Sequence, residues 1–133
     1  MQVEYLKPKG MHSNPAFSQA LIIPAGARIL VIGGQNSVND KGEIVFKGDL
    51  GKQTTKALEN LALCLEAANA GGEHLVKLTI HIAGDLDITP GFEAWMKFAG
   101  KSAHPPAVTV LKVLALGRPD FMVEIEGLAV LEG

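Results

Sequence analysis

The chain has 133 residues, 47% of them hydrophobic, and a formal net charge of −2. This length and apolar content are enough for one domain that buries about two thirds of its unfolded surface without disulfides. Lysine and arginine residues are spread singly along the sequence, which lacks the basic cluster typical of proteins that bind nucleic acid or an anionic membrane. We therefore expect a single domain over residues 1–133 that binds neither.

The N-terminus lacks the basic segment and apolar core of a secretion signal, and no uncharged run approaches the length of a membrane span. These two features predict a cytoplasmic protein. The single cysteine, Cys64, cannot form a disulfide within the chain. It lies in an apolar helical pattern without basic neighbours at helical spacing, so we interpret it as a small buried hydrophobic residue and not as a reactive thiol.

The first third of the chain predicts an arm followed by a hairpin. Residues 1–14 are polar and interrupted by proline and glycine, so we expect a loosely attached arm. Two strand-like runs follow at residues 17–23 and 28–32, and the Pro-Ala-Gly-Ala connection between them has turn chemistry. They are expected to form an antiparallel hairpin. Residues 43–46 follow a further turn as a loop or a short edge strand.

The middle of the chain has the most regular pattern. Over residues 52–69, apolar side chains recur at three- and four-residue steps with charged side chains opposite them, which predicts an amphipathic helix. We expect Asp49 to cap its start, and Gly71 and Gly72 to supply left-handed backbone at its end. Residues 75–83 then alternate between apolar and polar, which predicts a strand against which the helix packs.

A second helix and two strands complete the expected fold. The pattern over residues 89–99 begins with a cap-like threonine and a proline at the first helical position, which predicts a shorter helix. Residues 107–116 are so rich in branched apolar side chains that we expect a central strand. In residues 122–131, alternation places Glu124 and Glu126 on the face opposite their apolar neighbours.

This order of elements predicts an α+β fold with a mixed sheet. Right-handed crossovers place both helices on one face of the sheet. The other face is then left without a helical cover, although some of its side chains are apolar. Self-association is the economical way to bury that face.

Few residues have the spacing of a chemical site. The four histidines are scattered and lack the pairing or accompanying cysteines of a metal site, so no metal is expected. Gly33 and Gly34 lack the further residues of a phosphate loop. Glu124 and Glu126 remain, because two carboxylates on an apolar strand cost free energy unless they are solvated or bonded. They form either a hydrated surface or, if one lies in a cleft, a group that exchanges protons with water or a substrate nitrogen.

The order of several short motifs resembles the Rid family, the reactive intermediate deaminases also called YjgF proteins. The resemblance runs from about residue 15 to residue 130. It implies a chorismate-mutase-like fold assembled as a homotrimer, with clefts for a small metabolite between subunits and without a cofactor. The motifs that carry it are Phe17-Ser18-Gln19-Ala20, Gly33-Gly34-Gln35, Ala57-Leu58-Glu59-Asn60-Leu61, Val76-Lys77-Leu78-Thr79, Pro106-Ala107-Val108 and Val123-Glu124-Ile125-Glu126.

The resemblance also implies roles for single residues. In the best-characterised branch of the family, an arginine after the Pro-Ala pair binds the carboxylate of a 2-imino acid, and a glutamate of Glu-Ile-Glu assists attack of water on the imine. These positions are Val108 and Glu124 here. Valine cannot make the paired charge-assisted hydrogen bonds of a guanidinium. Phe17 and Gly33 stand where that branch usually has tyrosine and serine, so two hydroxyl donors are absent as well.

Two functions remain open from the sequence. One is hydrolysis of a reactive enamine, imine or related small compound to a carbonyl compound and ammonia, with Glu124 as general acid and base. Phe17, Gly33, Gln35 and Val108 are then the expected substrate-binding residues, and the usual 2-imino acids are not the expected substrates. The other is a trimer that binds a small metabolite, or acts like a chaperone, without turnover.

Overall fold

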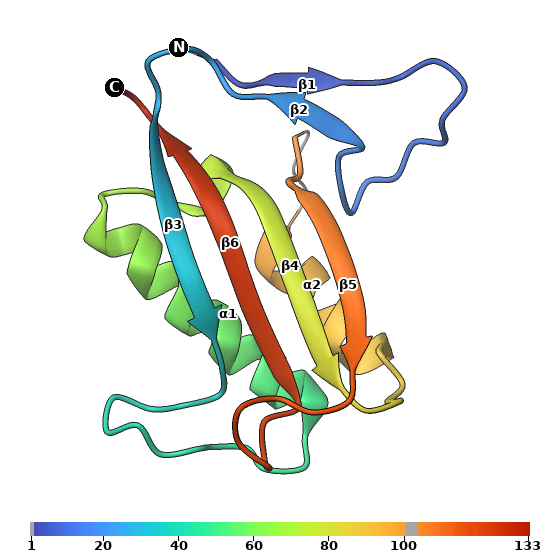
Figure 1. Ribbon diagram of the computed structural model, residues 1–133, viewed down its shortest axis with the longest axis vertical. Helices are drawn as coiled ribbons and strands as arrows, with labels where there is room; N and C mark the ends of the chain where they lie inside the picture. Colours follow the sequence, from blue (N-terminus) through green and yellow to red (C-terminus); the bar gives the residue numbers. More distant parts are fainter. Residues whose placement is uncertain (1, 101–103) are drawn as a thin grey trace.

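The computed structural model describes residues 2–100 and 104–133. Two helices cover one face of a four-stranded sheet, and a short two-stranded ribbon lies beside one end of that sheet (Figure 1). Neither helix in these two ranges is long and apolar enough to cross a membrane. The elements in chain order are β1 (Glu4–Leu6), β2 (Ala20–Ile22), β3 (Arg28–Gln35), α1 (Leu50–Ala67), the 3-10 turn η1 (Gly72–His74), β4 (Leu75–Ala83), α2 (Thr89–Ala99), β5 (Ala107–Val113) and β6 (Val123–Leu131).

The four-stranded sheet is mixed, with the strand order β3-β6-β4-β5. Strand β6 runs antiparallel to both of its neighbours, whereas β4 and β5 are parallel. A parallel pair needs a crossover connection, and α2 supplies it. The predicted α+β fold with two helices on one face of a mixed sheet is therefore confirmed.

The core lies between α1 and the two central strands. Leu58, Leu61 and Leu65 of α1 are at most 1% exposed. They belong to one buried cluster with Leu78 of β4 and Ile125 of β6. Each buried leucine contributes about 1.5 to 3 kcal/mol relative to an exposed one, so this layer holds the helix against the sheet.

The predicted start of α1 is confirmed, and its predicted end is wrong. The backbone N–H of Lys52 donates to Asp49 Oδ1 at 2.9 Å, which caps the helix. At the other end the left-handed residue is Asn69, with φ of 55°, whereas Gly71 is extended with φ of −133°. Asparagine tolerates this conformation better than most residues, so the chain reverses before it reaches the glycines.

The start of α2 also differs from the expectation. Thr89 is already helical, and the preceding residue, Ile88, makes no side-chain cap. The side chain of Asp87 does part of this work, because Oδ1 accepts the Thr89 N–H at 3.0 Å. Hydrogen bonding from the Thr89 backbone lowers the pKa of Asp87, since these bonds favour the ionised carboxylate.

The hairpin predicted for residues 17–23 and 28–32 is wrong. The connection between the two runs does turn the chain, but it leads from one sheet to the other. Strand β2 pairs with β1, where Leu21 lies opposite Tyr5, and β3 pairs with β6. Part of the expected loose arm is therefore a paired strand. Three residues are too few for a periodic pattern, so the sequence did not indicate β1.

The central position predicted for residues 107–116 is wrong within this chain. Strand β5 ends at Val113 and lies at the edge of the sheet, whereas β6 is central. Val110 and Leu111 are 47% and 45% exposed on its two faces. An apolar composition indicates that a strand is covered, but it does not say whether the cover comes from the same chain.

Gln53 joins two loops at the end of the sheet where β6 begins. Its side chain is fully buried, and its Nε2 donates to the carbonyl oxygens of Phe46 and Asp120 at 3.3 and 3.0 Å. Its Oε1 accepts the backbone N–H of Met122 at 3.0 Å. One glutamine thus fixes the loop that follows β3 against the loop that precedes β6.

We expect Gln53→Leu to lower the free energy of unfolding by about 2 to 3 kcal/mol, because the backbone groups it bonds lose their partners. The measurement is urea denaturation followed by circular dichroism. Thr55→Ala on the exposed side of α1 is the control and should change stability by less than about 0.5 kcal/mol. Equal midpoints for the two variants would contradict the role assigned to Gln53.

Candidate functional site

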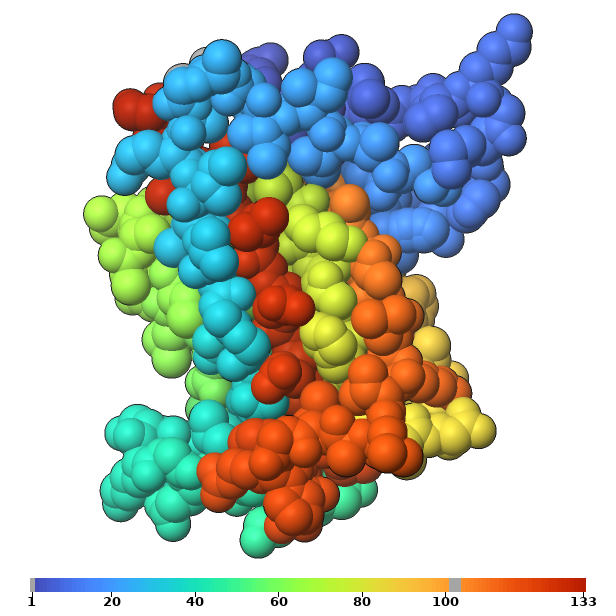
Figure 2. Space-filling view, viewed as in Figure 1, coloured from blue at the N-terminus to red at the C-terminus, as the bar shows by residue number. Residues whose placement is uncertain are grey.

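Glu124 lies on the face of the sheet that carries no helix, which is the face turned towards the viewer in Figure 2. It stands opposite His81 of β4. Its neighbours on β6, Val123 and Ile125, are fully buried on the helix side, so alternation directs Glu124 away from the core. The residue as a whole is half-buried. The face predicted for Glu124 from the sequence is the one observed.

Asn36 holds the Glu124 carboxyl in place. Its side-chain Nδ2 donates to Glu124 Oε1 at 3.0 Å and lies 3.4 Å from the carbonyl oxygen of Val123. The loop that carries Asn36 is itself fixed, because Asn60 Nδ2 of α1 donates to the carbonyl oxygens of Asn36 and Val38 at 3.0 and 2.9 Å. The carboxylate therefore has a fixed donor on one oxygen, and that donor is tied to the main helix.

A β-bulge at the end of β3 makes room for this arrangement. Ile32 pairs with Gly127 and Gln35 pairs with Ile125, so Gly33 and Gly34 together oppose one residue of β6. A Cβ on Gly34 would lie 2.8 Å from Glu124 Cδ, which is too close. The Glu124 side chain therefore packs directly on the backbone of Gly34.

The other two predicted residues of this strand end flank Gly34, on which Glu124 packs. Gly33 is exposed, and a Cβ there would meet no atom within 4 Å. Gln35 turns its side chain back onto the strand, where Nε2 donates to the Gly33 carbonyl oxygen at 3.1 Å. Gly33 and Gln35 are thus the chain neighbours of the glycine that contacts the candidate acid and base.

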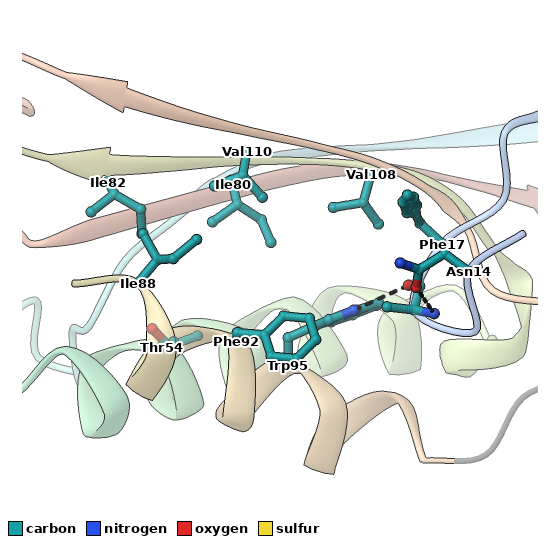
Figure 3. Close-up of a pocket in the computed structure, with 12 residues that line it drawn as sticks. Asn14, Phe17, Thr54, Ile80, Ile82, Ile88, Phe92, Trp95, Val108 and Val110 are labelled. Atoms are coloured by element: carbon teal, nitrogen blue, oxygen red, sulfur yellow. Dashed lines mark hydrogen bonds between the residues drawn. The ribbon is translucent and has the colours of Figure 1, made fainter. Parts of the chain in front are cut away.

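Phe17 and Val108 line a separate cavity on the helix side of the sheet. The cavity has a volume of about 220 Å³. Figure 3 shows side chains of β4 and β5 pointing across it towards α2, with Phe17 at one end. The lining residues are Asn14, Ala16, Phe17, Thr54, Ile80, Ile82, Ile88, Gly91, Phe92, Trp95, Val108 and Val110.

The cavity lining is apolar and uncharged. None of its lining residues is acidic, basic or histidine. Its buried polar groups are already bonded within the chain, since Thr54 Oγ1 donates to the Leu50 carbonyl oxygen at 2.7 Å and Trp95 Nε1 donates to the Ala16 carbonyl oxygen at 3.4 Å. Asn14 is exposed at the rim, and its Oδ1 accepts the Ala16 N–H. The arrangement suits an apolar group and provides no charge partner for an ion.

One copy of the chain does not bring the two groups of residues together. Val108 pairs with Leu78, whereas Glu124 pairs with His81, three residues further along β4. This separation is about 10 Å along the strands, and β4 lies between β5 and β6. Leu78 belongs to the core and Glu124 to the opposite face, so the two groups also lie on different sides of the sheet.

Sequence reasoning missed Asn36, the direct packing of Glu124 on Gly34, and the contribution of α2. Asn36 and Glu124 are far apart in the chain, and their contact depends on the register of the bulge. No local pattern reports such a register. Trp95 and Phe92 of α2 showed the spacing of core residues, which is the same whether a helix packs tightly or leaves a cavity.

Within residues 2–100 and 104–133, no group of three histidine, cysteine, aspartate or glutamate side chains is placed to hold a metal ion. The pair His81 and Glu126 comes nearest to an ionic contact on the open face, with Nε2 and Oε1 separated by 3.9 Å. His81 Nδ1 lies 3.4 Å from the carbonyl oxygen of Glu124. These contacts make this part of the open face polar.

The fold and this surface define a class of small α+β proteins with known relatives. A family model described as Endoribonuclease L-PSP matches residues 9–131. A RutC family protein from Pyrococcus horikoshii is 37% identical over 116 residues, which is 87% of each chain. Protein DfrA from Myxococcus xanthus is 29% identical over 128 residues, covering 92% of this chain and 95% of that protein.

Solved structures give the same result. The Rid family protein YyfB from Yersinia pestis has a TM-score of 0.85 and 29% identity, covering 98% of this chain and all of that one. The YjgF gene product of E. coli has a TM-score of 0.66 and 30% identity, covering 81% and 84% of the two chains. The protein belongs to the Rid/YjgF family, and the resemblance found in its motifs is confirmed.

We expect Gly34→Ala to displace the Glu124 side chain, because the new methyl group would overlap Cγ and Cδ. The displacement should break the bond from Asn36 and shift the signals of the Asn36 side-chain amide in a proton–nitrogen correlation spectrum. The free energy of unfolding should change by less than about 1 kcal/mol, since a flexible side chain can move away. Gly33→Ala is the matched control, and equal spectra for both variants would contradict the packing described.

Proposed function

We propose that this protein hydrolyses a reactive enamine, imine or related small compound to a carbonyl compound and ammonia. The observation that carries the proposal is the Glu124 carboxyl, held by Asn36 on an open face beside a glycine bulge. A fixed carboxylate at an accessible surface is suited to proton transfer with water. Family membership supports the assignment of this class of chemistry but does not identify the substrate.

In the proposed reaction, Glu124 accepts a proton from water as the water oxygen bonds to the imine carbon. The same carboxyl returns this proton to the nitrogen, which gives a carbinolamine. It then carries the hydroxyl proton of the carbinolamine to the nitrogen, the carbon–nitrogen bond breaks, and ammonia leaves as the carbonyl forms. An enamine first gains a proton on carbon to become the imine. Gln35 and the backbone at Gly33 flank Gly34, on which Glu124 packs, and we assign them the role of orienting the water or the substrate.

The usual 2-imino acids are not the proposed substrates. Val108 cannot bond a carboxylate, and the loss of two charge-assisted hydrogen bonds is worth on the order of 3 kcal/mol or more. Phe17 and Gly33 offer no hydroxyl group either. The preferred substrate is therefore a compound without a carboxylate at the usual place.

The complete site is proposed to form between copies of the chain in a homotrimer. Glu124 and Val108 lie on opposite faces of one sheet, so a small substrate cannot touch both within a single copy. The open face also carries exposed apolar side chains on β3, including Val31, which is 73% exposed. Packing this face and its edges against further copies would bury apolar surface and bring together residues of two copies.

A second candidate function is binding of a small apolar metabolite without turnover. The cavity behind Val108 favours it, because that cavity is ready-made, and its lining has no group that takes part in proton transfer. Glu124 distinguishes the two functions. Hydrolysis requires its carboxyl group, whereas ligand affinity in the cavity does not.

The test is ammonia release from freshly generated 2-iminopropanoate and from an enamine without a carboxylate. Wild-type protein should turn over only the uncharged compound, and Glu124→Gln should lower that rate by 10²-fold or more, in the range typical of general acid–base catalysis. Size-exclusion chromatography of the variant checks that its assembly is unchanged.

Three other results of this assay would change the proposal. Turnover of 2-iminopropanoate by wild-type protein would show that another group anchors the carboxylate, and the substrate argument would be wrong. Wild-type protein without turnover, together with activity that appears in Val108→Arg, would favour the binding function. Unchanged turnover in Glu124→Gln would remove Glu124 from the mechanism.

A further inference from the structure

We infer that the cavity between α2 and the β4–β5 pair binds the uncharged apolar side group of the ligand, of phenyl or branched-alkyl size. The inference names the substrate class for the proposed site and in that sense rests on the proposed function. The inference can be tested separately from the proposed function, because binding in the cavity can be measured without any turnover.

The size of the cavity limits its occupant. An engineered cavity of about 150 Å³ in another protein, lined by aliphatic and aromatic side chains, stays dry and binds benzene. The cavity here is larger, at about 220 Å³, and its walls are of the same kind. Phe17 closes one end, and buried Trp95 forms part of the floor (Figure 3). It is too small for a helix or strand of a partner protein and suits a group of about one ring.

The polarity of the cavity selects an uncharged group. An ionised carboxylate placed there would lose its hydration, and none of the lining side chains carries a compensating charge. The hydroxyl of Thr54 and the indole N–H of Trp95 already donate to backbone carbonyl oxygens, so they are not free to replace water. An uncharged group pays no such penalty.

The cavity is open to ligands at the free edge of the sheet. Phe92 on α2 and Val110 on β5 both line it, and they are 51% and 47% exposed. A ligand can therefore place its apolar group between them and keep its reactive carbon–nitrogen end outside. That end would then face whatever group lies beyond the edge, which in the proposed trimer is Glu124 of another copy.

Trp95 makes binding directly measurable. It is the only tryptophan of the chain, it is 4% exposed, and it lines the cavity. Benzamide and benzoate have nearly the same shape but differ in charge, so a fluorescence titration with each isolates the effect of charge. Wild-type protein should bind benzamide at least tenfold more tightly than benzoate. Val108→Arg should reverse this preference, because the guanidinium gives the carboxylate a partner.

Three variants serve as controls. Val108→Phe should fill the cavity and weaken benzamide binding at least tenfold. Leu63→Arg introduces the same charge on the exposed side of α1, away from the cavity, and should bind both probes as wild-type protein does. Glu124→Gln should abolish hydrolysis and still bind benzamide, because Glu124 does not line the cavity, which separates this inference from the proposed hydrolysis.

The inference is overturned if wild-type protein binds benzoate as well as benzamide, or if Val108→Phe leaves benzamide binding intact. It is also overturned if neither probe binds and Trp95 emission instead depends on protein concentration, because a neighbouring copy then fills the cavity. Absence of hydrolysis by wild-type protein with intact benzamide binding would contradict only the proposed function.

Discussion

Strand β6 is the central constraint of this structure, because it packs against the helices with one face only. Val123, Ile125 and Ala129 are fully buried on that face. Gly127 lies between them, and a Cβ there would come within 2.9 Å of the Lys77 carbonyl oxygen and closer still to Leu78. With these positions fixed by packing, the intervening glutamates must face away from the core. The location of the only proposed proton-transfer group thus follows from the packing of the strand that carries it.

The cavity has a related origin in the packing of the two helices. Gly91 lets α2 approach α1 closely, since a Cβ at this position would lie 3.3 Å from Thr54 Oγ1. Helix α2 therefore packs closely on α1 and leaves a cavity between itself and the edge strand β5. Val108 and Val110 are left facing a space instead of a packed helix. The apolar cavity and the half-buried Glu124 therefore lie on the two sides of the same sheet.

The sequence predicted those parts of the fold that depend on local periodicity. Helix α1, strand β4 and the two faces of β6 each extend over nine or more residues, so their patterns were unambiguous. Pairing partners were not predictable in the same way. Strands β1 and β2 have three residues each, and β5 looks central by composition although it is an edge. The site could also be predicted only where it depends on a local pattern. Alternation along β6 predicted the face on which Glu124 lies, whereas the contacts of Asn36 and Gly34 with Glu124 depend on a bulge register between distant segments.

The substitutions that separate this chain from the best-known pattern of its family are physically consistent with one another. An arginine at Val108 would direct a charge towards a space whose lining holds no acidic residue, so it would be stable there only with an anionic ligand. Valine needs no such ligand, and Phe17 extends the same apolar surface to the end of the cavity. In the proposed function, specificity is therefore assigned to the whole lining and not to Val108 alone. The lining needs no anionic ligand, so the proposed proton-transfer role of Glu124 is consistent with an uncharged substrate.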